Sequence, residues 1–423
     1  MQERINEQTI TATLRKAINN NLLNEEHKSI LFHDLDYLKK RVKRLKATFP
    51  PSTLHAIAIK ANPLPKMLEY LKNFEVGAEG ATLPEVYLAE KSKYEPSKII
   101  FDSPAKTFQD LRYVLKRGFH LNADSLDEID RISTIISEID TTSNIGLRIN
   151  PQVGTGKIKI TSTAGEYSKF GVPLEDKRDQ IVKHYQKNRW MNAVHLHIGS
   201  QGNPIDQLLD GIQKVYDFIE ELNKKLNGQI KYFDIGGGFP VSYYKDKEPP
   251  SLQKFRDQLE NRCPNLFADK YQLITEYGRS LHANSCWTGS RVEYVKNSKQ
   301  IDTAVIHVGA DLFTRRCYLP EQWHHEISVR DSKGNPKTGP KKRYNVVGPL
   351  CFSGDILSRN IELPQIEVGD YIIIHDTGAY TLSMWNRHLS RQIPLAVGYH
   401  NNGDQFITLK KKESLEDVYN FWQ

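Results

Sequence analysis

A lysine at the end of an apolar run is the first residue that could do chemistry. Lys60 closes the run LHAIAIK and is followed by Ala-Asn-Pro. Where such a run is a buried strand, desolvation favours the neutral amine, which can act as a nucleophile or Schiff-base former. Position alone leaves one alternative open, a strand-terminal lysine that reaches water.

A glycine-rich turn and an arginine could together hold a phosphate. The triplet 236–238 is Gly-Gly-Gly and follows the run YFDI, while Gly278 and Arg279 follow the run QLITEY. Backbone N–H groups approach a phosphate closely where no Cβ intervenes, and an arginine adds a bidentate clamp. If the two runs are the last strands of a (β/α)8 barrel, these loops form the usual phosphate site of that fold.

Two histidines, His195 and His197, alternate along one apolar run, so their side chains face the same side of a strand. Such a pair can bind a metal, or one histidine can stack on a planar cofactor while the other packs. Two buried, hydrogen-bonded histidines are a third alternative. A metal would need further ligands at neighbouring strand ends, where the chain offers glycines and Glu276 instead. Metal binding is therefore the weaker interpretation.

Glu276 stands three residues before Arg279. A carboxylate beside a phosphate site is repulsive unless it faces a cation, and a protonated pyridine nitrogen would be such a partner. Pyridoxal phosphate requires such a set of groups: an amine for its aldehyde, a phosphate site, an aromatic side chain that stacks on its ring, and this carboxylate. We therefore expect pyridoxal 5'-phosphate as the cofactor and no metal.

Eight short apolar runs, between about residue 54 and residue 279, would position these side chains. The runs end at Lys60, Glu79, Asp102, Asp124, Asn150, His197, Gly236 and Glu276. Helical patterns such as 64–73 and 105–117 fill the gaps. Strand and helix repeated eight times predict a (β/α)8 TIM barrel, in which reactive groups gather at the carboxyl ends of the strands.

The chain of 423 residues is longer than one typical domain and favours two. Beyond residue 285, runs such as DYIIIHD and FITLKK alternate with polar turns, which predicts a mostly β C-terminal domain over 285–423. The barrel would occupy 35–284. Within it, the long Gly-, Lys- and Thr-rich segment between Asn150 and Ala193 is a candidate active-site lid.

The composition excludes several classes of protein. Hydrophobic residues make up 39% and charged residues 26% of the chain, as in ordinary globular proteins. No apolar run reaches the roughly 18 residues that span a bilayer, and the N-terminus has no signal-peptide core, so we expect a cytoplasmic protein that does not bind membranes. The four cysteines form no CxxC pair, and the net charge of +7 is dispersed without a nucleic-acid motif.

Seven motifs in order carry a resemblance to a known family. They are AIKANP around Lys60, GAEGATLPE at 77–85, HLHIGSQ at 195–201, FDIGGGFP at 233–240, EYGRS at 276–280, GPLCFSGD at 348–355 and GAYTLSM at 378–384. With them, the chain resembles the fold type III (alanine-racemase-like barrel) pyridoxal phosphate enzymes, specifically the ornithine/diaminopimelate/arginine decarboxylases.

The resemblance implies a role for each matching residue. Lys60 would bind the cofactor covalently, His197 would stack on its ring and Glu276 would pair with the pyridine nitrogen. The remaining cofactor-binding residues, most of them at the phosphate, would be Ser200, Gly237, Gly238, Gly278, Arg279 and Tyr380. Cys351 would return a proton to Cα from the other subunit, which implies a homodimer with shared active sites. Residues 1–34 would join the C-terminal β domain.

Departures from the family pattern bear on the substrate. After the cysteine, the family usually has an acidic residue that helps to bind the far ammonium of the substrate, whereas this chain has Phe352. The aspartate that often ends the second strand is Glu79 here. Paired arginines, Arg315 and Arg316, lie where the family often places a substrate-binding arginine. We expect these two arginines and Asp355 to contact the substrate, and the alternative for the two arginines is a surface or interface role.

The sequence therefore predicts pyridoxal-phosphate-dependent decarboxylation of a small-molecule amino acid with a carboxylate at its distal end. That substrate is either diaminopimelate-like or an acyl- or citryl-conjugated diamino acid, as in siderophore biosynthesis. One alternative is an amino-acid racemase on the same barrel, which Cys351 argues against. Another is a metal-dependent barrel hydrolase that uses His195 and His197. The third is a non-catalytic relative, which has no need of Lys60, Glu276 and Cys351.

Overall fold

The computed structural model describes residues 4–423, which divide into two compact units. The barrel unit consists of Val42–Val241 and Pro249–Ser280. The β unit consists of the described residues up to Arg41, Ser242–Glu248 and Leu281–Gln423. No helix within residues 4–423 is long and apolar enough to cross a membrane.

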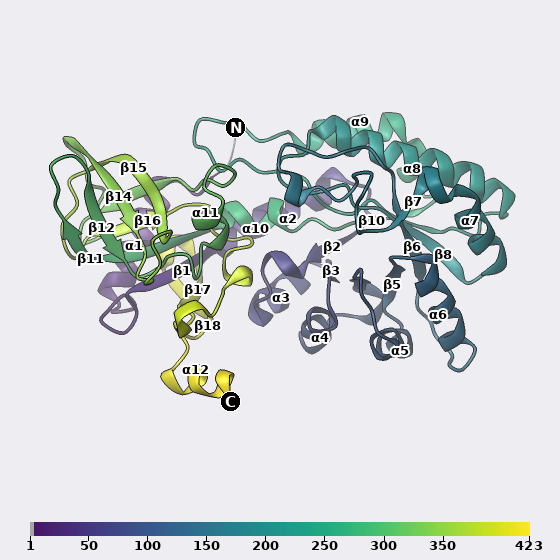
Figure 1. Ribbon diagram of the computed structural model, residues 1–423, viewed down its shortest axis with the longest axis horizontal. Helices are drawn as coiled ribbons and strands as arrows, with labels where there is room; N and C mark the ends of the chain where they lie inside the picture. Colours follow the sequence, from purple (N-terminus) through teal and green to yellow (C-terminus); the bar gives the residue numbers. More distant parts are fainter. Residues whose placement is uncertain (1–3) are drawn as a thin grey trace. The chain divides into compact units, whose positions relative to one another are not determined.

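The barrel unit is built on eight parallel strands within the described chain (Figure 1). They are β2 (Leu54–Ala58), β3 (Gly77–Gly80), β4 (Ile99–Asp102), β5 (His120–Ala123), β6 (Ile145–Asn150), β8 (Met191–His195), β9 (Tyr232–Asp234) and β10 (Gln272–Thr275). Pairing of β5 with β6 and of β10 with β2 closes the sheet, while the short β7 (Val172–Pro173) pairs with β6 outside the ring. The predicted TIM barrel is confirmed.

Helices follow the barrel strands along the chain. They are α3 (Pro65–Lys72), α4 (Leu83–Lys91), α5 (Phe108–Arg117), α6 (Leu126–Ile136), α7 (Leu174–Lys187), α8 (Ile205–Lys225), α9 (Leu252–Arg262) and α10 (Arg279–His282), with α2 (Leu35–Thr48) before β2. Helix α5 shows how the sequence sets their ends. Thr107 and Asp110 form a capping box at its start, and Gly118 with φ +71° ends it in the left-handed conformation.

The β unit is a mostly β domain, as predicted. Its strands are β1 (Ser29–Asp34), β11 (Cys286–Lys296), β12 (Asp302–Ile306), β13 (Ile327–Arg330), β14 (Lys341–Val347), β15 (Ile356–Pro364), β16 (Tyr371–Ile374), β17 (Leu395–His400) and β18 (Gln405–Lys410), with helices α1 (Glu7–Asn19), α11 (Thr314–Tyr318) and α12 (Leu415–Trp422). Strand β1 pairs antiparallel with β11 and parallel with β17. Phe32 in β1 stacks on its cross-strand partner Trp287 in β11, with ring centroids 4.1 Å apart.

Candidate active site

Lys60 and Glu79 form an ion pair at the rim of the barrel. Lys60 lies in a short 3-10 helix (Ile59–Ala61) directly after β2, and Glu79 lies in β3. The Nζ atom donates to both carboxylate oxygens, at 2.9 and 2.8 Å, and the Glu79 side chain is fully buried. Burial raises the pKa of Glu79 to about 7, while Lys60 limits the rise and Glu276 adds to it.

Two histidines lie beside Glu276, which directly follows β10. The Nε2 atom of His195 lies 3.5 Å and the Nδ1 atom of His197 lies 3.6 Å from its Oε2 atom. Burial opposes a charge on Glu276, but His195, together with Asp102, holds its pKa well below the usual range. Burial lowers the pKa of His197 to about 4, so this imidazole is neutral. Its Nδ1 atom accepts a hydrogen bond from Gly237 N at 3.2 Å, which leaves its proton on Nε2.

Two further carboxyls lie beside Glu276. Polar atoms of Asp102, His195, Asp234 and Glu276 all lie within 4.8 Å of one another. Burial, reinforced by Glu276, raises the pKa of both aspartates well above the usual range. Sequence reasoning did not count either aspartate as a site residue. The available signal was their position at strand ends on the same rim.

The predicted phosphate residues of the barrel lie at the ends of β8, β9 and β10. The Nε atom of Arg279 donates to Ser200 Oγ at 3.2 Å, and Arg279 is buried. A Cβ at Gly237 would lie 2.2 Å from the carbonyl oxygen of Glu276, and one at Gly238 would lie 2.0 Å from that of Gly199. The glycines therefore let three strand-end loops approach one another closely around a buried guanidinium group.

The predicted lid segment lies along the loop that carries His197 and Ser200. Thr163 N donates to Ile198 O at 2.9 Å, and its hydroxyl donates to His197 O at 2.5 Å. Ser200 N donates to Thr161 O at 2.9 Å. This segment therefore supports the backbone on which two of the predicted cofactor residues are placed.

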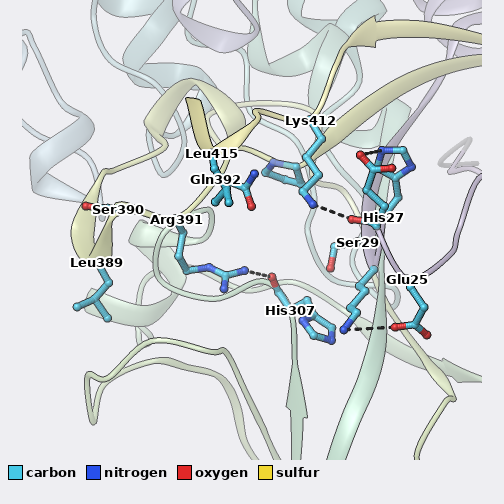
Figure 2. A pocket seen from close by; sticks show the side chains of 13 residues that line it. Glu25, His27, Ser29, His307, Leu389, Ser390, Arg391, Gln392, Lys412 and Leu415 are labelled. Atoms are coloured by element: carbon cyan, nitrogen blue, oxygen red, sulfur yellow. Dashed lines mark hydrogen bonds and ion pairs between the residues drawn. The ribbon is translucent and has the colours of Figure 1, made fainter. Parts of the chain in front are cut away.

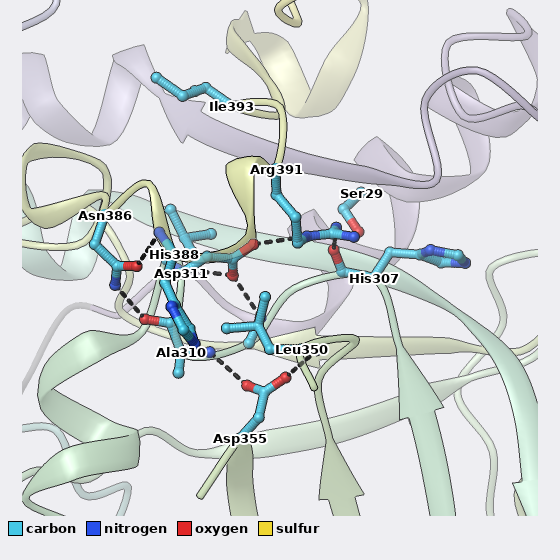
Figure 3. A network of polar contacts seen from close by, with 12 residues as sticks. Ser29, His307, Ala310, Asp311, Leu350, Asp355, Asn386, His388, Arg391 and Ile393 are labelled. Carbon is cyan, nitrogen blue, oxygen red and sulfur yellow. Dashed lines mark hydrogen bonds and ion pairs between the residues drawn. The ribbon is translucent and has the colours of Figure 1, made fainter. Parts of the chain in front are cut away.

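In the β unit, Cys351 lies between β14 and β15 and is exposed. Figure 3 shows the carboxylate that anchors this loop: Asp355 is buried and accepts hydrogen bonds from Leu350 N at 2.7 Å and Ala310 N at 2.5 Å. Phe352 stacks on Tyr318, with centroids 5.1 Å apart. Asp355 thus braces the Cys351 loop, and its contact with the substrate stays a prediction.

The two predicted substrate arginines also bond to backbone within the β unit. Arg315 Nη2 donates to the carbonyl oxygens of Ala379 and Tyr380, both at 3.0 Å. Tyr380 has φ +56°, so Arg315 braces a residue in an unfavourable backbone conformation. Arg316 donates to carbonyl oxygens of Pro320, Trp323 and Leu357 at 2.7, 2.9 and 2.7 Å. The substrate contacts of both arginines stay predictions.

The β unit also contains a polar pocket of about 370 Å³ (Figure 2). Its cations already have partners: Lys412 donates to Glu26 O at 2.8 Å, Lys28 lies 3.6 Å from Glu25 Oε2, and Arg391 donates to His307 O at 2.7 Å. The donor groups of the pocket are therefore already engaged in hydrogen bonds or ion pairs with the protein itself.

The barrel residues fit pyridoxal phosphate. The Oε1 atom of Glu276 is buried and has no hydrogen-bond partner among residues 4–423, as a site for a ring N–H requires. Lys60 supplies an amine that is about one-third exposed at the same rim. Arg279 and Ser200, framed by the glycine loops, supply donors for a phosphate.

A TIM barrel with these groups at the carboxyl ends of its strands defines a pyridoxal-phosphate enzyme. Residues 35–283 match the family described as pyridoxal-dependent decarboxylase, pyridoxal binding domain. The chain belongs to this pyridoxal-dependent decarboxylase family.

Individual relatives are similar over most of their length. A diaminopimelate decarboxylase of Methanocaldococcus jannaschii is 30% identical over 370 residues, which cover 86% of this chain and 82% of that protein. One from Helicobacter pylori is 29% identical over 403 residues, 93% of this chain and 96% of that protein. The crystal structure of the Helicobacter pylori diaminopimelate decarboxylase complexed with L-lysine has a TM-score of 0.84 and 27% identity, covering 96% and 99% of the two chains.

These findings confirm three predictions: the cofactor pyridoxal phosphate, a small-molecule amino-acid substrate and decarboxylation as the reaction. The racemase and metal-hydrolase alternatives are not favoured.

Proposed function

We propose that this enzyme removes one carboxylate from diaminopimelate or from a similar amino acid with a carboxylate at its distal end. The observation that carries the proposal is the 30% identity, over 86% of the chain, to a protein named diaminopimelate decarboxylase. Phe352 is consistent with it, because an aromatic ring stacked on Tyr318 offers no negative charge to a distal ammonium, and in these substrates a distal carboxylate can balance that ammonium or replace it. Acyl or citryl conjugates of diamino acids, the siderophore-type substrates, also carry a distal carboxylate and belong to the same test.

We propose that the barrel residues divide the work of holding the cofactor. Bound pyridoxal phosphate supplies an electron sink for the pair released when the bond between Cα and the carboxylate breaks. Lys60 would hold its aldehyde, and the anionic Glu276 would accept a hydrogen bond from its ring nitrogen. His197 would cover the ring. Ser200, Gly237, Gly238, Gly278 and Arg279 would hold the phosphate, and Tyr380, which is not a barrel residue, would join them.

We further propose that the enzyme is a cytoplasmic homodimer in which Cys351 of the partner subunit returns a proton to Cα. The exposure of Cys351 on its own chain supports this arrangement. Mixing Lys60→Ala with Cys351→Ala protein tests it, because each mixed dimer holds one site with both residues intact. Recovery of activity on mixing is expected. No recovery between subunits that do exchange would contradict shared sites.

The substrate is tested by carbon dioxide release with pyridoxal phosphate present. The panel contains lysine, ornithine, arginine, meso- and LL-diaminopimelate, and citryl or other acyl conjugates of diamino acids. We expect turnover only of substrates whose distal end carries a carboxylate. Turnover of ornithine or lysine at a comparable kcat/KM would contradict the proposal, because another group would then bind the distal ammonium.

A metal-dependent reaction is tested on the same protein. We expect activity to survive dialysis against a chelator and to be lost on removal of pyridoxal phosphate. Loss of activity with the chelator, and survival of activity without pyridoxal phosphate, would instead favour a metal-dependent hydrolase that uses His195 and His197.

A further inference from the structure

Behind Glu276, the barrel interior contains a carboxyl that none of the roles above uses. Asp102 ends β4 and is 7% exposed. Its Oδ1 atom lies 3.4 Å from Nδ1 of His195, whose Nε2 atom lies 3.5 Å from Oε2 of Glu276. The imidazole of His195 therefore stands between the two carboxyls.

The atoms that face one another here lack other partners. Both oxygens of Asp102 and both ring nitrogens of His195 are buried without a hydrogen-bond partner elsewhere in residues 4–423. Buried polar atoms are rarely left unpaired. The separations of 3.4 and 3.5 Å are long for hydrogen bonds, but they join atoms that face one another, and the carboxyls of Asp102 and Glu276 also contact each other directly.

The charges and protons of these three side chains are satisfied by the following arrangement. Burial lowers the pKa of His195, so its imidazole is neutral, with one donor and one acceptor nitrogen. Glu276 is anionic and can only accept, so Nε2–H donates to it. The Nδ1 atom must then accept, and only a protonated Asp102 can donate to it.

The charges around Asp102 favour that protonated form. The other titratable groups on the surrounding strands and strand ends are Lys60, Glu79, His120, Asp124, Arg148, His197 and Asp234. Burial, followed by Glu276, Asp234 and Glu79, raises the pKa of Asp102. Carboxyls this close cannot all be ionised, and Glu276 is the one that keeps its charge.

We propose that Asp102 is a protonated carboxyl that donates to His195, and that His195 in turn donates to Glu276. This chain orients Glu276 and stabilises it as the anion that faces the cofactor ring. Asp102 and His195 are thus positioning residues. The inference rests on the proposed role of Glu276.

Asp102→Asn and Asp102→Leu test the proposal directly. An asparagine amide can donate to His195 as the acid does, whereas leucine cannot. We expect Asp102→Asn to bind pyridoxal phosphate like the wild type. Asp102→Leu should raise the dissociation constant by about tenfold to a hundredfold, as for loss of a hydrogen bond to a charged group. If Asp102 acted as an anion, asparagine would be as damaging as leucine, and the proposal would be wrong.

The pH dependence of cofactor affinity gives a readout that a purely structural role would not move. Wild-type affinity should decline at alkaline pH as Asp102 loses its proton, and Asp102→Asn should lack that part of the decline. Identical profiles for the two proteins would overturn the proposal.

Histidine variants provide a matched comparison. His195→Phe removes the bridging imidazole, whereas His55→Phe removes another buried barrel histidine, whose Nδ1 atom lies 2.8 Å from Thr275 Oγ1. We expect only His195→Phe to change the visible spectrum and affinity of bound pyridoxal phosphate. Equal effects of the two substitutions on cofactor binding would show that His195 acts only through packing.

Glu276→Gln separates failure of this inference from failure of the proposed function. If Glu276→Gln weakens cofactor binding but Asp102→Leu and His195→Phe do not, the inference fails and the role of Glu276 stands. If Glu276→Gln also binds cofactor with the wild-type spectrum and affinity, the proposed role of Glu276 fails first.

Discussion

Both carboxylate oxygens of Glu79 accept hydrogen bonds from the ammonium group of Lys60, at 2.9 and 2.8 Å. The parallel register of β2 and β3 places Ala58 beside Glu79, so the residues that follow β2 reach this carboxylate. The strand-terminal lysine is therefore held at the barrel rim rather than left to reach water alone. This arrangement keeps the amine close to Glu276 and His197. The positive charge of Lys60 contributes to the lowered pKa of His197.

Lys60→Ala should abolish covalent cofactor binding, because it removes the amine that follows β2 at the barrel rim. We expect the visible absorbance of bound pyridoxal phosphate to disappear and borohydride reduction to add no cofactor mass. Lys46→Ala, which removes a surface lysine paired with Glu75, is the control and should keep both signals. Retained absorbance in Lys60→Ala would contradict the assignment.

Glu79→Gln should change how the stability of the cofactor-free protein depends on pH. The folded-state pKa of Glu79 is raised from 4.5 to about 7, so folding favours its proton. Its contribution to stability is fully present below pH 4.5 and is lost as pH rises through about 7. That loss is about 3 kcal/mol in the free energy of unfolding. Chemical denaturation across this range should show a decline in Glu79→Gln that is smaller than that of the wild type by about this amount.

The exposed Glu75 provides the control for this prediction. Glu75→Gln should keep the wild-type decline. A Glu79→Gln profile parallel to the wild type would show that Glu79 does not take up a proton on folding.

Gly238→Ala should destabilise the barrel more than Gly228→Ala. Both glycines have positive φ, +92° and +73°, so both substitutions strain the backbone. Only at Gly238 would the added Cβ lie 2.0 Å from a carbonyl oxygen; at Gly228 the nearest atom is 3.6 Å away. We expect an additional loss of about 1–3 kcal/mol in urea denaturation. Equal losses would show that the loop around Gly238 relaxes freely.

Arg279→Ala should weaken cofactor binding, because it removes the buried guanidinium group beside Ser200 that would bind the phosphate. The expected rise in the dissociation constant is about tenfold to a hundredfold, with partial recovery in Arg279→Lys. Arg262→Ala removes an arginine paired with Asp210 at the surface of the same unit and should bind cofactor normally. Absorbance titration distinguishes these outcomes, and unchanged affinity in Arg279→Ala would remove Arg279 from the phosphate site.

Cys351→Ala should slow turnover by roughly a hundredfold or more while leaving the cofactor spectrum intact, as expected for loss of a general acid. Burial raises the pKa of Cys263, Cys286 and Cys317 to about 12, so iodoacetamide should modify the exposed Cys351 first. Peptide mass spectrometry identifies which cysteine is modified, and the residual activity shows whether that modification affects turnover. Full activity after modification of Cys351 would exclude it from the mechanism.

The sequence by itself determined the barrel and its reactive rim. Parallel barrel strands are buried on both faces, so they read as short continuous apolar runs, and all eight runs became strands of the ring. Closing such a sheet brings every carboxyl strand end to one rim. For this reason Lys60, Glu276 and Arg279 could be assigned to one barrel rim from their places at the ends of runs.

The tertiary structure alone decided which groups meet. The contact of Lys60 with Glu79 and the approach of Asp102, His195 and Glu276 depend on the stagger between strands of the closed sheet, which no local pattern encodes. Asp102 and Asp234 were therefore overlooked. Likewise, Arg315 and Arg316 suggested a substrate site by their charge, yet their guanidinium groups are bonded to backbone carbonyls that long-range folding brings to them.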